Sequence, residues 1–199
     1  MTPMSRDLCD GPSRPRSYRA GTRARSKSRN ERPSPLALAP FLGHNPRPMP
    51  VDLNVDLGEL PNEPEELYAL ATVVNIACGG HAGVEASMKR AVELARSFGA
   101  RIAAHPSYPD REGFGRRSLK LPPSALYEAV VEQCDTLVQI AREMGARIEL
   151  VKLHGALYHD AARDPSIAAA VLDGVVSALP DGPVIVGPGH GVLAPAAEA

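Results

Sequence analysis

Residues 72–105 read TVVNIACGGHAGVEASMKRAVELARSFGARIAAH and contain a complete strand, helix and strand. The apolar run at 72–77 has the length of a buried strand, and a second one follows at 101–105. Gly99 stands where the end of a helix favours a left-handed residue. Between the strands, an apolar stripe recurs at helical spacing: Met88, Ala91, Val92, Ala95 and Phe98. This unit predicts two neighbouring parallel strands.

The same alternation extends in both directions from this unit. VDLNVDL at 51–57 alternates apolar and polar residues at strand period, and a small helix is expected at about 65–70. Further on, helices are expected from Pro122 to near Gly145 and from Asp164 to about Ala178, with strands at 147–153 and 183–187. We therefore predict an α/β fold whose five parallel strands form an open sheet or part of a barrel.

The N-terminal quarter of the chain has a different composition. Residues 1–50 carry a net charge of +7, whereas residues 51–199 carry −8. The first 48 residues are rich in Arg, Ser and Pro and lack periodicity, so we expect a disordered basic leader at 1–48 before one folded domain at 51–199. A nucleic-acid tail or a targeting peptide is the functional alternative. We favour a solvated leader or an early assigned start, because Met49 directly precedes the first strand, and we expect no nucleic-acid partner.

Cysteine usage and hydropathy predict a cytoplasmic protein with no membrane partner. The apolar stretch LALAPFLG at 36–43 is short and is broken by Pro40, so neither a signal peptide nor a membrane span is indicated. The three cysteines are odd in number and lack metal-type spacing. Cys134 falls on the apolar stripe of a predicted helix and is expected in the core.

Polar side chains gather at the C-terminal end of every predicted strand. In parallel sheets and barrels, ligands bind at that edge. We therefore expect one pocket bordered by Asn54, Asp56, Glu59, Asn75, Cys78, His81, His105, Lys152, His154 and His190.

Single residues in this set have simpler explanations. Asp56 and Glu59 are also suited to capping the next helix, and a lone histidine is more often a loop or core residue. Cys78 is either a nucleophile or, as we favour, a small packing residue, since nothing near it in the sequence would activate a thiolate. In the loop HPSYPDREGFGRR at 105–117, Arg111 and Arg116 suit an acidic substrate, although a surface salt-bridge loop explains them almost as well.

Four motifs together resemble the LamB/YcsF family, which contains the A subunit of bacterial-type 5-oxoprolinase. They are DLNVDLGE at 52–59, NIACGGHAG at 75–83, AHPSYPDREGFGRR at 104–117 and VKLHGALYH at 151–159, and the resemblance covers residues 51 to about 199. It implies a (β/α) barrel of the glycoside hydrolase/deacetylase type. It also implies that two partner subunits, B and C, help to open the lactam of 5-oxoproline to glutamate at the expense of ATP with Mg.

The resemblance also suggests roles for the clustered residues. Asp56 or Glu59 is expected to direct water, Lys152 to hold a developing oxyanion or phosphate, and His81, His105 or His154 to move protons. The candidates for substrate binding are Asn54, Asn75, His81, His105, Arg111 and Arg116. Related deacetylases hold a metal with one Asp and two His, and Asp56 with two of His81, His105 and His154 offers such a set. The spacing alone does not define a metal site.

The chain departs from the family pattern in three respects. The family usually reads CGFHAGD where this chain has Gly80 and Val84, and KPHGALYN where it has Leu153 and His159. Family members also continue past the fifth strand, so we expect an incomplete barrel of about five strands from a fragment, a frameshifted gene or half of a split subunit. Two alternatives to the oxoprolinase therefore stay open: a noncatalytic fragment or binding module, and a stand-alone metal-dependent amidase or carbohydrate deacetylase.

Overall fold

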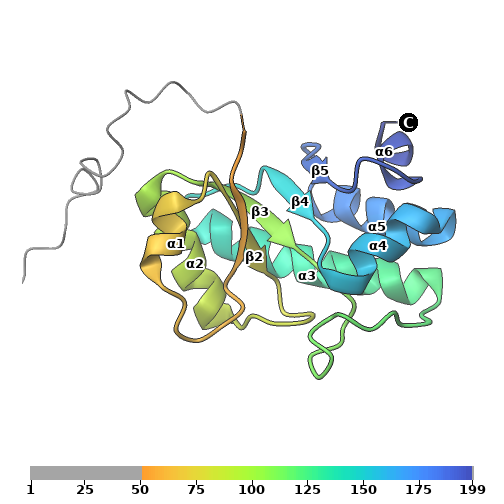
Figure 1. Ribbon diagram of the computed structural model, residues 1–199, viewed down its shortest axis with the longest axis horizontal. Helices are drawn as coiled ribbons and strands as arrows, with labels where there is room; N and C mark the ends of the chain where they lie inside the picture. The colour runs from red at the N-terminus through yellow and green to blue at the C-terminus, as the bar shows by residue number, and fades with distance from the viewer. Residues whose placement is uncertain (1–50, 199) are drawn as a thin grey trace, which may run out of the picture. The chain divides into compact units, whose positions relative to one another are not determined.

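Strands and helices alternate along the computed structural model, which describes residues 51–198. The leader expected at 1–48 lies outside the described residues. In chain order the elements are β1 (Asn54–Leu57), α1 (Glu65–Leu70), β2 (Val73–Ala77), α2 (Glu85–Phe98), β3 (Arg101–His105), α3 (Pro123–Glu143), β4 (Leu150–Lys152), α4 (Gly155–Arg163), α5 (Pro165–Ala178), β5 (Val184–Val186) and α6 (Leu193–Ala197) (Figure 1).

The five strands form one parallel sheet in the order β1-β2-β3-β4-β5, which is also their order in the chain. The register places Asp56 opposite Asn75, Asn75 opposite Ala103, and Ala77 opposite His105. In the part of the chain that is described, β1 and β5 are the outer strands. The predicted α/β fold with parallel strands is confirmed.

The two faces of the sheet have different partners. Successive side chains of a strand point to opposite faces. One face belongs to the main core, where α2 and α3 pack on β2 and β3, and its strand residues include Leu57, Val74, Ile76, Ile102, Ala104 and Val151. The opposite face carries a small apolar cluster of Val73, Ala103 and Leu150 beneath the polar strand ends. Polar chemistry is therefore concentrated on the face away from the main core.

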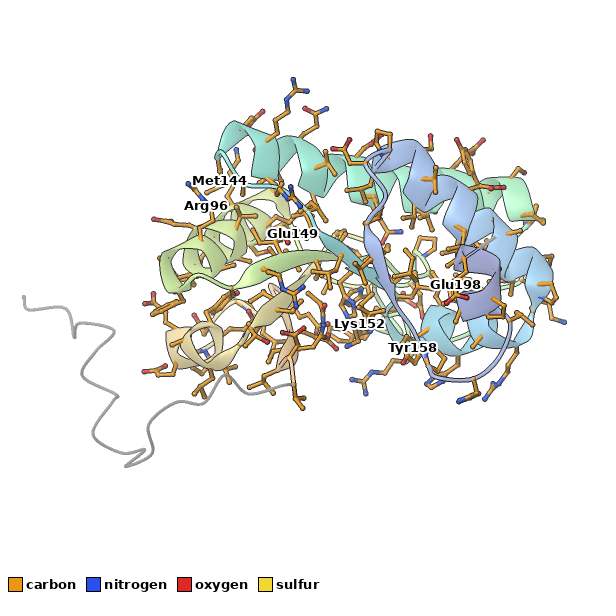
Figure 2. All side chains as sticks on the ribbon, turned by 90° about the horizontal axis from the view of Figure 1, so that it is seen from above. Arg96, Met144, Glu149, Lys152, Tyr158 and Glu198 are labelled. Atoms are coloured by element: carbon orange, nitrogen blue, oxygen red, sulfur yellow. The ribbon has the colours of Figure 1, made fainter. Side chains whose placement is uncertain are left out.

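The helices on the main core begin and end as the sequence predicts. Pro122 and Pro123 start α3, where a missing N–H costs nothing, and Gly99 ends α2 in the left-handed region at φ 75°. The Arg96 guanidinium of α2 donates to the Met144 carbonyl at the end of α3, which ties the two helices together (Figure 2). Cys134 is completely buried, as expected, but Phe98 at the end of the predicted stripe is 37% exposed.

Two helices were not expected from the sequence, α4 and α6. Helix α4 follows β4 directly and leads into α5, whose predicted cap is confirmed because the Asp164 carboxylate accepts from the Ser166 N–H. Among residues 51–198, none of the helices combines the length and apolar character that a membrane span requires.

Candidate functional site

Four consecutive strands deliver polar side chains to one place. Asp56 on β1, Asn75 on β2, His105 on β3 and Lys152 on β4 share a sheet face near the C-terminal strand ends. Glu59 follows β1, His81 follows β2, and His154 immediately precedes α4. Direct contacts connect eight of the expected residues: Asn54, Asp56, Glu59, Asn75, His81, His105, Lys152 and His154.

The Asp56 carboxylate forms the polar centre of the sheet face. Lys152 Nζ and Asn75 Nδ2 each lie 2.6 Å from its Oδ1, and His105 Nε2 lies 3.5 Å from its Oδ2. Burial opposes ionisation of Asp56, but the nearby His105 and the hydrogen bonds from Lys152 and Asn75 outweigh it and hold the pKa of Asp56 well below its ordinary value. Asp56 is therefore an anion that keeps the Lys152 ammonium group in place.

Three histidines surround the Glu59 carboxylate. Glu59 Oε1 lies 3.0 Å from His81 Nε2, 3.4 Å from His154 Nδ1 and 3.9 Å from His105 Nε2. The His81 and His154 rings are stacked with centroids 3.6 Å apart, and the His105 ring stands edge-on to both. All three histidines are buried, whereas the Glu59 side chain is 15% exposed. These four residues form the imidazole cluster.

Two histidines of the imidazole cluster, His81 and His154, are neutral beside an anion. Burial, reinforced by the charges of the neighbouring imidazoles, lowers the pKa of His154 to about 4. Burial also lowers the pKa of His81, although its hydrogen bond to Glu59 acts in the opposite direction. Burial of Glu59 opposes its ionisation, but the hydrogen bond from His81 and the histidine charges lower its pKa overall. At neutral pH these two imidazoles are therefore uncharged, and each keeps one nitrogen lone pair.

A tight turn after β1 holds Glu59 in position. Gly58 occupies the left-handed region at φ 76°. The Glu63 carboxylate accepts from three successive backbone N–H groups, those of Gly58, Glu59 and Leu60, at 2.7, 2.8 and 2.9 Å. Sequence reasoning missed Glu63, whose signal is a carboxylate placed a few residues after a glycine turn. Helix α1 begins after Pro64 without a side-chain cap, so neither Asp56 nor Glu59 caps it.

The loop at 106–121 packs closely against the imidazole cluster. His154 Nε2 lies 3.0 Å from the Phe114 carbonyl oxygen, and the Ala156 N–H donates to the Gly115 carbonyl. Gly115 has φ 65°, and a Cβ atom added to it would lie 2.9 Å from the His81 Cβ. Glycine is therefore required at 115 so that the loop can cover the two stacked histidines.

A pocket of about 780 Å³ opens beside Asp56, His105, Lys152 and His154. Lys152 and Tyr158, which both line it, are labelled in Figure 2. Arg116 also lines the pocket, with its guanidinium carbon 5.6 Å from the centre of the Phe114 ring. Arg111 does not line this pocket; it donates to the Gly83 carbonyl instead. Only the second of the two expected arginines therefore borders the space beside Lys152.

Helix α4 adds pocket residues that sequence reasoning missed: Tyr158, His159, Asp160 and Arg163. Their signal was the apolar spacing of Leu157, Ala161 and Ala162, which are buried and place the opposite helix face toward the pocket. His190, which was also expected at the pocket, is exposed and does not line it.

Cys78 has a packing role, as favoured from the sequence. Its side chain is buried, its thiol donates to the Ile76 carbonyl at 3.0 Å, and its sulfur accepts the His105 N–H at 3.1 Å. Burial raises the pKa of the thiol to about 12, which leaves almost no thiolate at neutral pH. Cys78 therefore supports the backbone that carries His105.

Comparison with known proteins agrees with this arrangement. The model of the LamB/YcsF family matches residues 51–199. The chain is also similar to the crystal structure of the lactam utilization protein from Thermus thermophilus, with 36% sequence identity and a TM-score of 0.71. That match covers 75% of this chain and 62% of the Thermus protein, so the chain spans less than two thirds of that protein's length. The chain belongs to the LamB/YcsF family.

Proposed function

We propose that this chain is a component of an ATP-dependent 5-oxoprolinase, which opens the lactam of 5-oxo-L-proline to give L-glutamate. The observation that carries the proposal is the Lys152–Asp56 ion pair, which lies at the wall of a pocket that Arg116 also lines. A cyclic amide with one carboxylate needs a cation for that carboxylate and a second cation for charge on the carbonyl oxygen. The name of the Thermus relative, a lactam utilization protein, points to the same substrate class.

The chemistry requires activation because a lactam carbonyl is a poor electrophile. Transfer of the γ-phosphoryl group of ATP to the lactam oxygen makes the ring carbon reactive, and a water molecule adds to it. The ring C–N bond then breaks as the nitrogen gains a proton, which leaves an acyl phosphate. A second water molecule hydrolyses this phosphate, so the products are glutamate, ADP and phosphate.

Residue roles follow from charge and position. Lys152 stabilises the negative charge of the transferred phosphoryl group or of the carbonyl oxygen, and Asp56 holds its ammonium group in place. Asp56 is too weak a base to take a proton efficiently, because its pKa is held so low. His154 borders the pocket, but its Nε2 faces the Phe114 carbonyl and its Nδ1 faces His105, so we assign protonation of the ring nitrogen to water and binding of the substrate carboxylate to Arg116.

The proposal includes the rest of the assembly. Subunits B and C and ATP with Mg complete the reaction, which we place in the cytoplasm. The sheet in chain order has the strand sequence that a (β/α) barrel of the glycoside hydrolase/deacetylase type requires, and we propose that β1 to β5 form part of such a barrel.

The test is glutamate formation from 5-oxoproline by the chain reconstituted with subunits B and C, with and without ATP. We expect ATP-dependent turnover, and we expect Asp56→Asn to lower kcat by roughly 10²- to 10⁴-fold, because Lys152 loses its anchor. The control is Asp52→Asn. Asp52 pairs with the exposed Arg101 near the other end of the strands, so this variant should keep wild-type turnover.

Two results would contradict the proposal. Full turnover by Asp56→Asn would show that the ion pair takes no part in the reaction. Lactam or amide hydrolysis by the isolated chain at the same rate without ATP would instead support the stand-alone amidase alternative.

A further inference from the structure

Two neutral histidine rings would leave no hydrogen between the nitrogens through which His105 and His154 face each other. His105 Nδ1 lies 2.6 Å from the Lys152 carbonyl oxygen, and His154 Nε2 lies 3.0 Å from the Phe114 carbonyl oxygen. A carbonyl oxygen only accepts, so these two nitrogens carry the ring hydrogens. The other nitrogens, His105 Nε2 and His154 Nδ1, then present lone pairs to each other at 2.9 Å.

Two lone pairs at this distance repel unless a positive charge lies beside them. Glu59 Oε1 approaches the same two nitrogens at 3.9 and 3.4 Å and adds negative charge. Hydrogen bonds from the distal ring nitrogens to backbone carbonyls are the contacts that orient metal-binding histidines. Either a shared proton or a metal ion could supply the positive charge, and the arrangement of all three donor atoms favours the ion.

We propose that Glu59 Oε1, His105 Nε2 and His154 Nδ1 bind one divalent transition-metal ion. Ligands at about 2.0–2.1 Å from a tetrahedral zinc ion lie roughly 3.3 Å apart, and the three donor atoms are separated by 2.9, 3.4 and 3.9 Å. Small side-chain shifts would therefore complete the triangle. His105 and His154 line the pocket, so the fourth coordination position faces the substrate space.

His81 belongs to the cluster but has a different role. Its ring is within 3° of parallel to the His154 ring at 3.6 Å, and lone pairs that lie in two stacked parallel planes do not meet at one ion. His81 Nε2 is 3.0 Å from Glu59 Oε1 and is suited to donate to it. His81 Nδ1 is then a buried nitrogen with no hydrogen-bond partner among the described residues. His81 is therefore a positioning residue for the Glu59 ligand.

The donor set indicates the class of metal. Two imidazoles and one carboxylate suit zinc and neighbouring first-row ions, and zinc with this set and an open position occurs in hydrolytic sites. The sequence pointed to Asp56 as the carboxylate of a metal site, but the structure gathers Glu59 with the histidines, while Asp56 is bound by Lys152 and Asn75. The inference concerns ion binding and does not rest on the proposed reaction.

The test is titration of the full chain, stripped with a chelator, with Zn²⁺ at pH 7.5 by calorimetry, and with Co²⁺ by visible absorption. We expect one ion per chain. Glu59→Gln, which preserves side-chain shape, and His105→Ala should each weaken binding by more than about 100-fold. His81→Ala should keep one site and weaken it by about 10- to 100-fold, because it only orients a ligand. His159→Ala changes a histidine of the same pocket outside the cluster and should bind like wild type.

Circular dichroism and urea unfolding identify variants that fail to fold, and the near-isosteric Glu59→Gln keeps the test valid if His105→Ala is one of them. Absence of ion uptake by the folded wild-type chain would overturn the inference and assign a shared proton to the histidine pair. Equal affinity of wild type and folded Glu59→Gln would also overturn it. Metal binding by a chain that shows no 5-oxoproline turnover would count against the proposed function and not against this site.

Discussion

The carboxylate of Asp56 and the carboxylate of Glu59 are only three residues apart in sequence but have different neighbours. Asp56 meets an ammonium group and an amide, whereas Glu59 meets three imidazoles. Sequence reasoning grouped the two as interchangeable, because residue type and position after β1 do not reveal which side chains approach from β3 and β4. The structure separates a charged pair at the pocket from the imidazole cluster beside it.

Cys78 is a residue for which the sequence correctly favoured a packing role over a nucleophilic one. A glycine-rich turn next to a cysteine is compatible with a nucleophile, but no activating residue adjoins it in the sequence. Burial decides the matter, because it raises the pKa of the thiol to about 12. The same effect raises the pKa of Cys134 well above its ordinary value.

Both buried thiols should therefore resist alkylation in the folded protein. We expect iodoacetamide at pH 8 to leave Cys78 and Cys134 unmodified in native conditions and to modify both in urea, as followed by peptide mass spectrometry. Modification of native Cys78 at the rate of a free thiol would show that it is exposed or activated.

At the scale of elements, the strands and long helices were predictable, but α4 was not. Strand period in the second half of 51–57, where β1 forms, and the proline start of α3 are local signals that survive folding. Helix α4 begins at Gly155 with φ 57° and has no side-chain cap. This helix is stabilised by the burial of Leu157 and Ala161 and not by a cap. Because tertiary packing stabilises it, the local sequence did not predict it.

Gly155 should be essential at the start of α4. A Cβ atom at this position would lie 2.4 Å from the Gly115 carbonyl oxygen, in addition to the left-handed strain. Gly182 has a similar φ of 75° with no neighbour within 4 Å of the added atom, so it isolates the strain alone. We expect Gly182→Ala to lower the free energy of unfolding by about 1–2 kcal/mol, and Gly155→Ala to lower it by at least about twice as much. Equal losses in urea unfolding would show that the close approach to Gly115 is absent.

The loop at 106–121 should be sensitive to acid through Asp110. The hydrogen bond from Arg117, assisted by the Gly113 N–H, lowers the pKa of Asp110 from 3.8 to about 2. A carboxylate with a depressed pKa stabilises the fold fully above its unfolded pKa and loses that effect as pH falls through the folded one. The stability advantage of wild type over Asp110→Asn should therefore be complete above about pH 5 and shrink between about pH 4 and pH 2.

Urea unfolding across this pH range measures the difference. Glu112→Gln is the matched control, because Glu112 is 92% exposed and contacts Arg117 at 3.6 Å, so its removal should change stability by less than about 0.5 kcal/mol. An advantage of wild type over Asp110→Asn that persists unchanged at pH 2 would contradict the assignment of the stabilisation to the ionised carboxylate.

At the scale of the whole molecule, the sequence predicted where the site would form more reliably than how it is built. Parallel strands in chain order bring their C-terminal ends to one edge, so eight of the expected residues meet. The departure at Arg111 has a simple cause: its guanidinium reaches the Gly83 carbonyl, a contact between loops that strand period does not encode. The sequence therefore predicted which strand ends meet, but not which atoms the long side chains contact.

Asp56 and Lys152 are 96 residues apart in the sequence, on β1 and β4, and their side chains meet only in the folded sheet. The central claim is that such distant residues act as one catalytic unit. A double-mutant cycle on ATP-dependent glutamate formation, with Asp56→Asn, Lys152→Met and the double variant, tests this claim most directly. We predict a coupling free energy of about 1–3 kcal/mol, so the double variant loses less activity than the product of the two single losses. Additive losses in kcat/KM would contradict the account.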